Sequence, residues 1–244
     1  FDFSNTRELM GWLASYSINI KMSIANSFPL NFTHFWSLAV EEQFYLFWPI
    51  IIVLVPKINL KQVIIFSIIF SLLIKYYLVL FTSCSMASSS LVFTNMHSLG
   101  LGALMAYFFV TGKIDLWFRN VRLLKNIGAL SVLVYLLVYC LLIPNNYLVV
   151  LMPLKSMCHV YLFGLIVLIA IMDGFYGVAK FLLENRVVVY LGKISYGMYL
   201  FHMFIGPLYF HFINKYLQLE LEGVGLFVAF FVINVIISSV SWHL

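Results

Sequence analysis

Long apolar segments separated by short charged links dominate this sequence. Of its 244 residues, 64% are hydrophobic and only 9% are charged, whereas about a quarter of the residues of an average soluble domain are charged. An apolar helix of about 20 residues crosses the hydrocarbon core of a bilayer and satisfies its own backbone hydrogen bonds there. The sequence therefore predicts an all-α fold, a polytopic transmembrane helix bundle, and argues against a soluble globule.

Seven segments have the length and apolar character of spanning helices, although Ser98–Val110 is short and extends back through Asn95. An eighth segment, Leu9–Ile20, is too short to cross and carries polar side chains, so we expect it to be interfacial or re-entrant. The seven predicted spans are Leu38–Val55, Val63–Phe81, Ser98–Val110, Ile127–Ile143, Met157–Met172, Ile194–Ile213 and Val224–Trp242.

The basic residues predict an orientation in the membrane. Links 56–62, 112–125 and 173–193 carry several lysines and arginines, whereas link 82–94 carries none. Because cytoplasmic links are enriched in lysine and arginine, we expect these three basic links in the cytoplasm of a multi-pass protein of the cell (inner) membrane. The segments expected outside are 21–37, 82–94 and 211–222.

Charge and cysteine content exclude other classes of protein. The net charge is +5, but no run of basic residues is present, so the composition does not predict nucleic-acid binding. The three cysteines (Cys84, Cys140 and Cys158) are an odd number without motif spacing, which predicts neither a disulfide framework nor a metal site.

Two adjacent carboxylates begin the first predicted span, in the sequence HFWSLAVEEQFYLFWP at residues 34–49. A carboxylate at membrane depth is costly, so Glu41 and Glu42 are expected to face the bundle interior and to find partners. Tyr45 lies one helical turn after Glu41 on the same face. Alternatively, both carboxylates lie in the first turns of an outward helix end, where water and the helix dipole stabilise them. Both interpretations remain open.

Histidines lie close to the same predicted outer side. His34 precedes the first span and suits a general base, a hydrogen-bond donor or an interfacial residue. His97 begins the third span, so it could share a pocket with His34. Gly100 and Gly102 follow His97 and predict close helix packing.

A polar stripe marks the sixth span, in LGKISYGMYLFHMF at residues 191–204. Ser195, Tyr199 and His202 follow one another at spacings of four and three residues and therefore share a helix face. Interhelical hydrogen bonds are the simplest explanation for the stripe, and contact with a substrate is the other. Lys75 and His159 are interpreted as isolated polar residues.

The sequence resembles the acyltransferase-3 family of membrane-bound O-acyltransferases that modify bacterial surface polysaccharides. HFWSLAVEEQFYLFWP resembles the family signature, NMHSLGLGALMAYF a later helix, and LGKISYGMYLFHMF a further conserved segment. The resemblance implies acyl transfer, in particular from acetyl-CoA, to a carbohydrate hydroxyl. It implies no bound cofactor, and as partners the membrane lipid, the carbohydrate acceptor and acyl-CoA.

Residues 1–244 therefore read as a single acyltransferase-3 domain, incomplete at both ends. Helices that carry an arginine and a histidine base in the family have no counterpart here, and SVSWHL resembles the start of an element that ends in Glu–Pro. We therefore expect this chain alone to be inactive.

Acyl transfer to a hydroxyl requires a base, a group that stabilises the oxyanion, and a cavity where donor and acceptor meet. Two other functions remain alternatives: a proton-coupled transporter, although the sequence has no duplicated halves, and a non-catalytic polysaccharide-export subunit. No metal site is predicted. The residues assigned to the site are Glu41, Glu42 and His34 as catalytic, and Tyr45, His97, Ser195, Tyr199 and His202 as substrate-binding.

Overall fold

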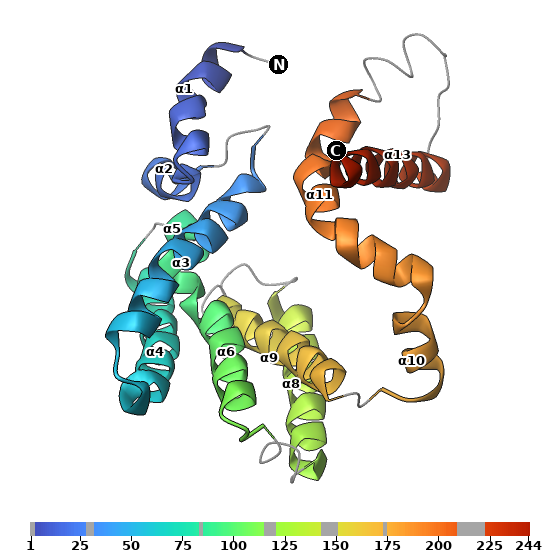
Figure 1. Ribbon diagram of the computed structural model, residues 1–244. Helices are drawn as coiled ribbons and strands as arrows, with labels where there is room; N and C mark the ends of the chain where they lie inside the picture. Colours follow the sequence, from blue (N-terminus) through green and yellow to red (C-terminus); the bar gives the residue numbers. More distant parts are fainter. Residues whose placement is uncertain are drawn as a thin grey trace. The chain divides into compact units, whose positions relative to one another are not determined.

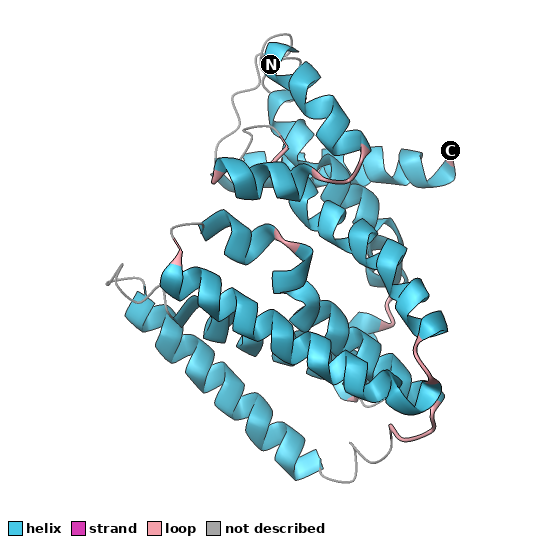
Figure 2. Ribbon diagram, turned by 90° about the vertical axis from the view of Figure 1, so that its left-hand side faces the viewer, coloured by secondary structure: helices cyan, strands magenta, loops and turns pink. Residues whose placement is uncertain are grey.

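The computed structural model describes residues 3–27, 32–82, 85–114, 121–142, 151–172, 175–208 and 223–244. These residues form helices joined by short turns, and no strand is found among them (Figures 1 and 2). Six helical stretches of the described chain are long and apolar enough to cross a membrane. Five of them are single helices: α3 (Phe35–Leu54), α4 (Lys57–Phe81), α9 (Met152–Ile171), α11 (Arg186–Leu208) and α13 (Gly223–His243). The sixth, Met86–Val110, contains most of α5 (Ser85–Ser90) and all of α6 (Val92–Val110).

A seventh long helix, α8 (Val121–Leu142), stands where the fourth span was predicted, and its apolar part covers Asn126–Leu137. The predicted all-α polytopic bundle is therefore confirmed. The predicted start of the second span at Val63 was too late, because α4 begins at Lys57. Long basic side chains can lie along an apolar helix while the charged end reaches water, so charge in the first turns does not end a helix.

The short segment Leu9–Ile20 contains a helix break. Helix α1 (Phe3–Ala14) has 12 residues and α2 (Ile18–Ala25) has 8, so neither reaches the length of a span. Between them Tyr16 has a φ of 49°. The Ser15 hydroxyl donates to the Gly11 carbonyl at 2.7 Å, in addition to the Ser15 backbone N–H at 3.1 Å. The local hydroxyls thus favour two short helices over one.

The chain divides into two compact units, each described here by itself. Unit 1 contains the described residues 3–27 and 36–172, in which α4 packs on α6, α8 on α9 and α2 on α5. Trp48, Ile64 and Leu104 form one of its apolar core clusters. At Gly100 an added Cβ would lie 2.7 Å from Ile68 Cγ1, so this glycine permits the predicted close packing. At Gly102 no such packing is found among the described residues, because an added Cβ would meet none of their atoms within 4 Å.

Unit 2 contains residues 32–35 and the described residues from 175 onward, with α10 (Gly177–Leu183), α11 and α13. Helices α11 and α13 approach closely at Gly197, where an added Cβ would lie 3.3 Å from Ser238 Cβ. The buried Asn234 amide donates to the Met198 carbonyl at 3.1 Å, and Ser238 donates to Asn234 at 3.3 Å. Small residues and polar contacts of this kind hold transmembrane helices together.

Candidate functional site

The segment around His34 packs against α11 within unit 2. The Tyr199 hydroxyl donates a 2.7 Å hydrogen bond to the His34 carbonyl. Nε2 of His34 lies 3.2 Å from the carbonyl oxygen of Leu200. Two consecutive residues of one helix thus hold the backbone and the ring of a histidine that lies more than 160 positions earlier in the sequence.

The contact with Leu200 determines which nitrogen of His34 is basic. A carbonyl oxygen only accepts hydrogen bonds, so Nε2 must donate the proton, and the lone pair of the neutral ring then lies on Nδ1. His34 is 7% exposed, and this burial lowers its pKa below the ordinary histidine value. The bond to Leu200 opposes the shift, and the nearby His202 adds to it. The geometry therefore fixes a neutral imidazole whose basic nitrogen, Nδ1, is itself buried.

Aromatic side chains of α11 lie around the ring of His34. The ring centroids of His34 and His202 are 5.0 Å apart, and those of His34 and Phe204 are 5.9 Å apart. His202 directs Nδ1 at the Tyr199 carbonyl, so its own lone pair lies on Nε2. The predicted polar stripe is therefore divided: Tyr199 and His202 meet His34, whereas Ser195 donates to the Gly192 carbonyl of its own helix.

Both predicted carboxylates lie in unit 1, on the first turns of α3. Glu41 is exposed in this unit and Glu42 is half-buried, while Tyr45 is 59% exposed. Among the described residues, neither carboxylate has a hydrogen-bond or ion-pair partner. His34 and His202 belong to unit 2, so the cavity that we expect them to share with a carboxylate stays a prediction.

Gln43 explains why Glu41 is exposed. Its amide donates to the Tyr16 carbonyl at 2.8 Å and exchanges two hydrogen bonds with the Asn19 amide, at 2.9 and 3.1 Å. The fully buried Asn19 also donates to the Ser90 carbonyl at 3.2 Å. Successive helical residues point about 100° apart, so fixing Gln43 against Tyr16 and Asn19 turns Glu41 about 200° away from α2.

The sequence analysis did not assign Gln43 and Asn19 a positioning role. The sequence does show two polar amide side chains on apolar segments, 24 residues apart. Nothing in the sequence indicates that these two side chains form hydrogen bonds with each other.

A buried polar network joins three helices of unit 1. The two ring nitrogens of His97 lie 3.2 Å from the Ser71 hydroxyl and 3.1 Å from the Ser156 hydroxyl. Lys75 donates to the same Ser156 hydroxyl at 3.3 Å. The interpretation of Lys75 as isolated was wrong, because α4 and α9 bring it to Ser156. His159 is not isolated either, since its ring centroid lies 4.5 Å from that of Tyr135.

His97 has both ring nitrogens engaged and is 4% exposed, so in this structure it links α4, α6 and α9. Its role in substrate binding stays a prediction. Within the described chain, no three His, Cys, Asp or Glu side chains gather to hold a metal ion.

Ser156→Ala should destabilise the folded protein, because it leaves buried groups of His97 and Lys75 without their shared partner. The expected loss is about 1–3 kcal/mol, the usual cost of an unsatisfied buried polar group. Thermal unfolding in detergent, followed by tryptophan fluorescence, measures it. Ser67→Ala is the matched control, because Ser67 donates only to the Ile64 carbonyl of its own helix. Equal melting temperatures for the two variants would show that the network contributes no stability.

The fold and these polar groups define a class of protein: a multi-pass helical membrane protein with histidine and carboxylate groups at the ends of its helices. Comparison with known families then identifies the chain. The sequence profile of the acyltransferase-3 family, described as an acyltransferase domain, matches residues 5–243. The chain belongs to this family.

The curated relatives of this chain have names that agree with the family description. Provisionally named O-acetyltransferases of Staphylococcus aureus strains COL, MSSA476 and MRSA252 are each 28% identical to the chain over 177 residues. Each match covers 69% of this chain and 28% of the relative, so the chain corresponds to less than a third of those proteins. No solved structure is significantly similar to it.

Proposed function

We propose that the membrane protein containing these residues transfers an acyl group, in particular acetyl, from acyl-CoA to a hydroxyl of a cell-surface carbohydrate. Family membership and the O-acetyltransferase names of the relatives support the acyl transfer. His34 supports the proposal for the acceptor, because its ring is held in one orientation with one basic nitrogen. This nitrogen, Nδ1, is buried in unit 2, so the proposal requires the side chains that cover it to move when the acceptor binds. The carbohydrate and the acyl-CoA rest on the family resemblance.

In the proposed reaction, a hydroxyl oxygen of the sugar attacks the thioester carbon, the hydroxyl proton passes to a base, and the thiolate of CoA leaves. The resemblance places the family's histidine base before Phe1, and Glu41 orients that imidazole. His34 binds the acceptor by accepting a hydrogen bond from a neighbouring sugar hydroxyl on Nδ1. Tyr199 and Leu200 keep this nitrogen in place, which reduces the entropy that must be lost before reaction.

Membranes that contain the full protein should transfer label from acetyl-radiolabelled CoA to surface glycan, and mild alkali should release the label because O-acetyl esters are alkali-labile. Residues 1–244 expressed alone should lose this activity by several orders of magnitude, since the proposed base is then missing. Activity is normalised to the amount of membrane-inserted protein.

Strong transfer by residues 1–244 alone would place the base within this chain. Failure of the full protein to label glycan, together with proton uptake in reconstituted vesicles, would favour the transporter alternative.

A further inference from the structure

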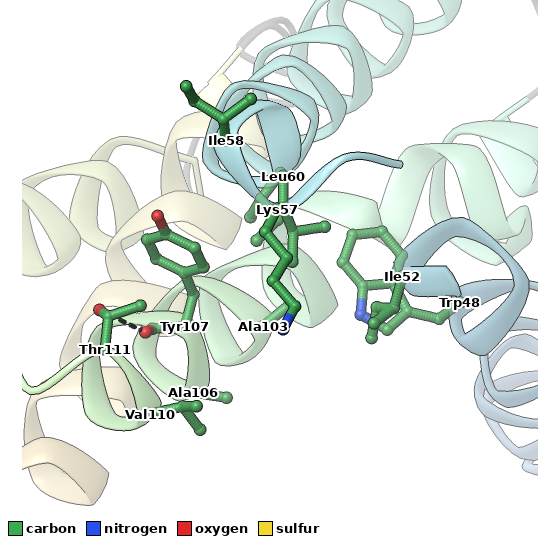
Figure 3. A pocket seen from close by; sticks show the side chains of 11 residues that line it. Trp48, Ile52, Lys57, Ile58, Leu60, Ala103, Ala106, Tyr107, Val110 and Thr111 are labelled. Carbon is green, nitrogen blue, oxygen red and sulfur yellow. Dashed lines mark hydrogen bonds between the residues drawn. The ribbon is translucent and has the colours of Figure 1, made fainter. Parts of the chain in front are cut away.

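A pocket lies in unit 1, where the end of α3, the start of α4 and the end of α6 meet (Figure 3). Its volume is about 670 Å³, within the usual range of about 300–1,000 Å³ for ligand pockets. Glu41 and Glu42 lie toward the other end of α3. The pocket is therefore separate from the carboxylates of the candidate site in this unit.

The walls of the pocket are apolar and partly open to the surroundings. Trp48 lies in the wall, while Ile58 and Val110 at the rim are each 83% exposed. Since α3, α4 and α6 are long and apolar enough to cross a membrane, we expect these exposed apolar side chains to face lipid near the end of the spans. The pocket therefore offers a lateral entry for an apolar chain.

One cationic side chain lies in this apolar pocket. In Figure 3 the Lys57 side chain extends from the start of α4 into the space between Tyr107 and Trp48. Among the described residues no carboxylate pairs with Lys57. The Thr111 hydroxyl already donates to the Tyr107 carbonyl at 2.8 Å. A ligand of this pocket thus needs one anionic group for Lys57 and an apolar part for the walls.

Other positive charges gather at the same end of unit 1. Lys61 lies one turn after Lys57, with its ammonium 5.9 Å from the Phe108 ring centroid, and Lys113 follows Thr111 by two residues. The basic links that contain these lysines are those expected in the cytoplasm. Anionic phospholipids are concentrated in the cytoplasmic leaflet and attract juxtamembrane lysines.

We propose that this pocket binds an anionic phospholipid of the cytoplasmic leaflet, with the phosphate at Lys57 and an acyl chain between Trp48 and Tyr107. The proposal is independent of the proposed acyl transfer. A coenzyme A thioester fits the pocket less well, because its three phosphates and adenine require more polar partners than one lysine supplies.

Quenching of Trp48 tests the proposal, because bromine on a lipid acyl chain quenches only a nearby tryptophan. The full protein, with Trp48 as its sole tryptophan, is placed in phosphatidylcholine nanodiscs with increasing amounts of brominated phosphatidylglycerol or brominated phosphatidylcholine. Half-maximal quenching should require about fivefold less brominated phosphatidylglycerol than brominated phosphatidylcholine, the effect expected for one lysine near an anionic lipid.

Two variants separate the pocket from general surface charge. Lys57→Gln should abolish the fivefold preference, whereas Lys61→Gln should keep it, because Lys61 adds charge at the same end of α4 but does not line the pocket. Ala106→Phe should reduce quenching by both brominated lipids by filling the pocket while Lys57 stays in place. Circular dichroism and gel filtration show whether each variant is folded.

Several results would overturn the proposal. Equal quenching by the two lipids, or the same loss of preference in both lysine variants, would mean that the pocket selects no anionic lipid. Relief of quenching by micromolar acetyl-CoA would assign the pocket to the acyl donor instead.

Discussion

Glu41→Gln should lower acyl transfer by the intact protein about 100-fold, the scale of losing one electrostatic contact in a reaction's transition state. The substitution removes the negative charge of a side chain that Gln43 turns away from α2, and it keeps the side-chain shape. Transfer of acetyl to surface glycan, normalised to membrane-inserted protein, is the measurement. Expression should change much less than activity.

Glu42→Gln is the matched control for this prediction, because it removes the same charge from the next residue of α3. We expect it to lower transfer less than about tenfold, as Glu42 is half-buried and is expected to brace the helix end. Wild-type activity in both variants would show that the carboxylates only stabilise the first turns of α3. A greater loss of transfer in Glu42→Gln than in Glu41→Gln would mean that Glu42 orients the base and Glu41 braces the helix end.

His34→Gln should lower kcat/KM for the acceptor about 100-fold, mainly by raising KM, because glutamine does not place its acceptor oxygen where Nδ1 would receive the sugar hydroxyl. Tyr199→Phe leaves the imidazole intact and removes only the hydrogen bond to the His34 carbonyl, so a loss of about tenfold or less is expected. Initial rates at varied acceptor concentration measure both effects. If His34 contacts the acceptor, KM should rise in Tyr199→Phe with little change in kcat. Full activity of His34→Gln would remove His34 from the site.

The pH dependence of transfer gives an independent test of the His34 environment. Burial lowers the His34 pKa, so the neutral ring persists to lower pH than for an ordinary histidine, and activity should fall only in more acidic solution. His202 also lowers this pKa. His202→Gln should therefore raise the His34 pKa and move the acid limb of the rate profile to higher pH. An unchanged acid limb would mean that another group controls it.

Some features of this protein followed from the sequence alone. The long apolar segments predicted a helical membrane protein, because no other regular element satisfies its backbone within a segment in lipid. The spacing of Tyr199 and His202 predicted a shared helix face, since helical periodicity is local. The motif at residues 34–49 pointed to the family, which the comparison confirmed.

Contacts between distant segments could be decided only by the tertiary structure. Asn19 pairs with Gln43, Lys75 meets Ser156, and Tyr199 holds His34 across separations of 24, 81 and 165 residues. The identity of one polar residue in an apolar helix does not specify its partner, because several rotations and neighbours would satisfy it equally well. Only the packing of the helices determines which partner the polar residue contacts. For the same reason the sequence assigned polar residues to a site but did not reveal that Gln43 orients α3 or that Leu200 selects the basic nitrogen of His34.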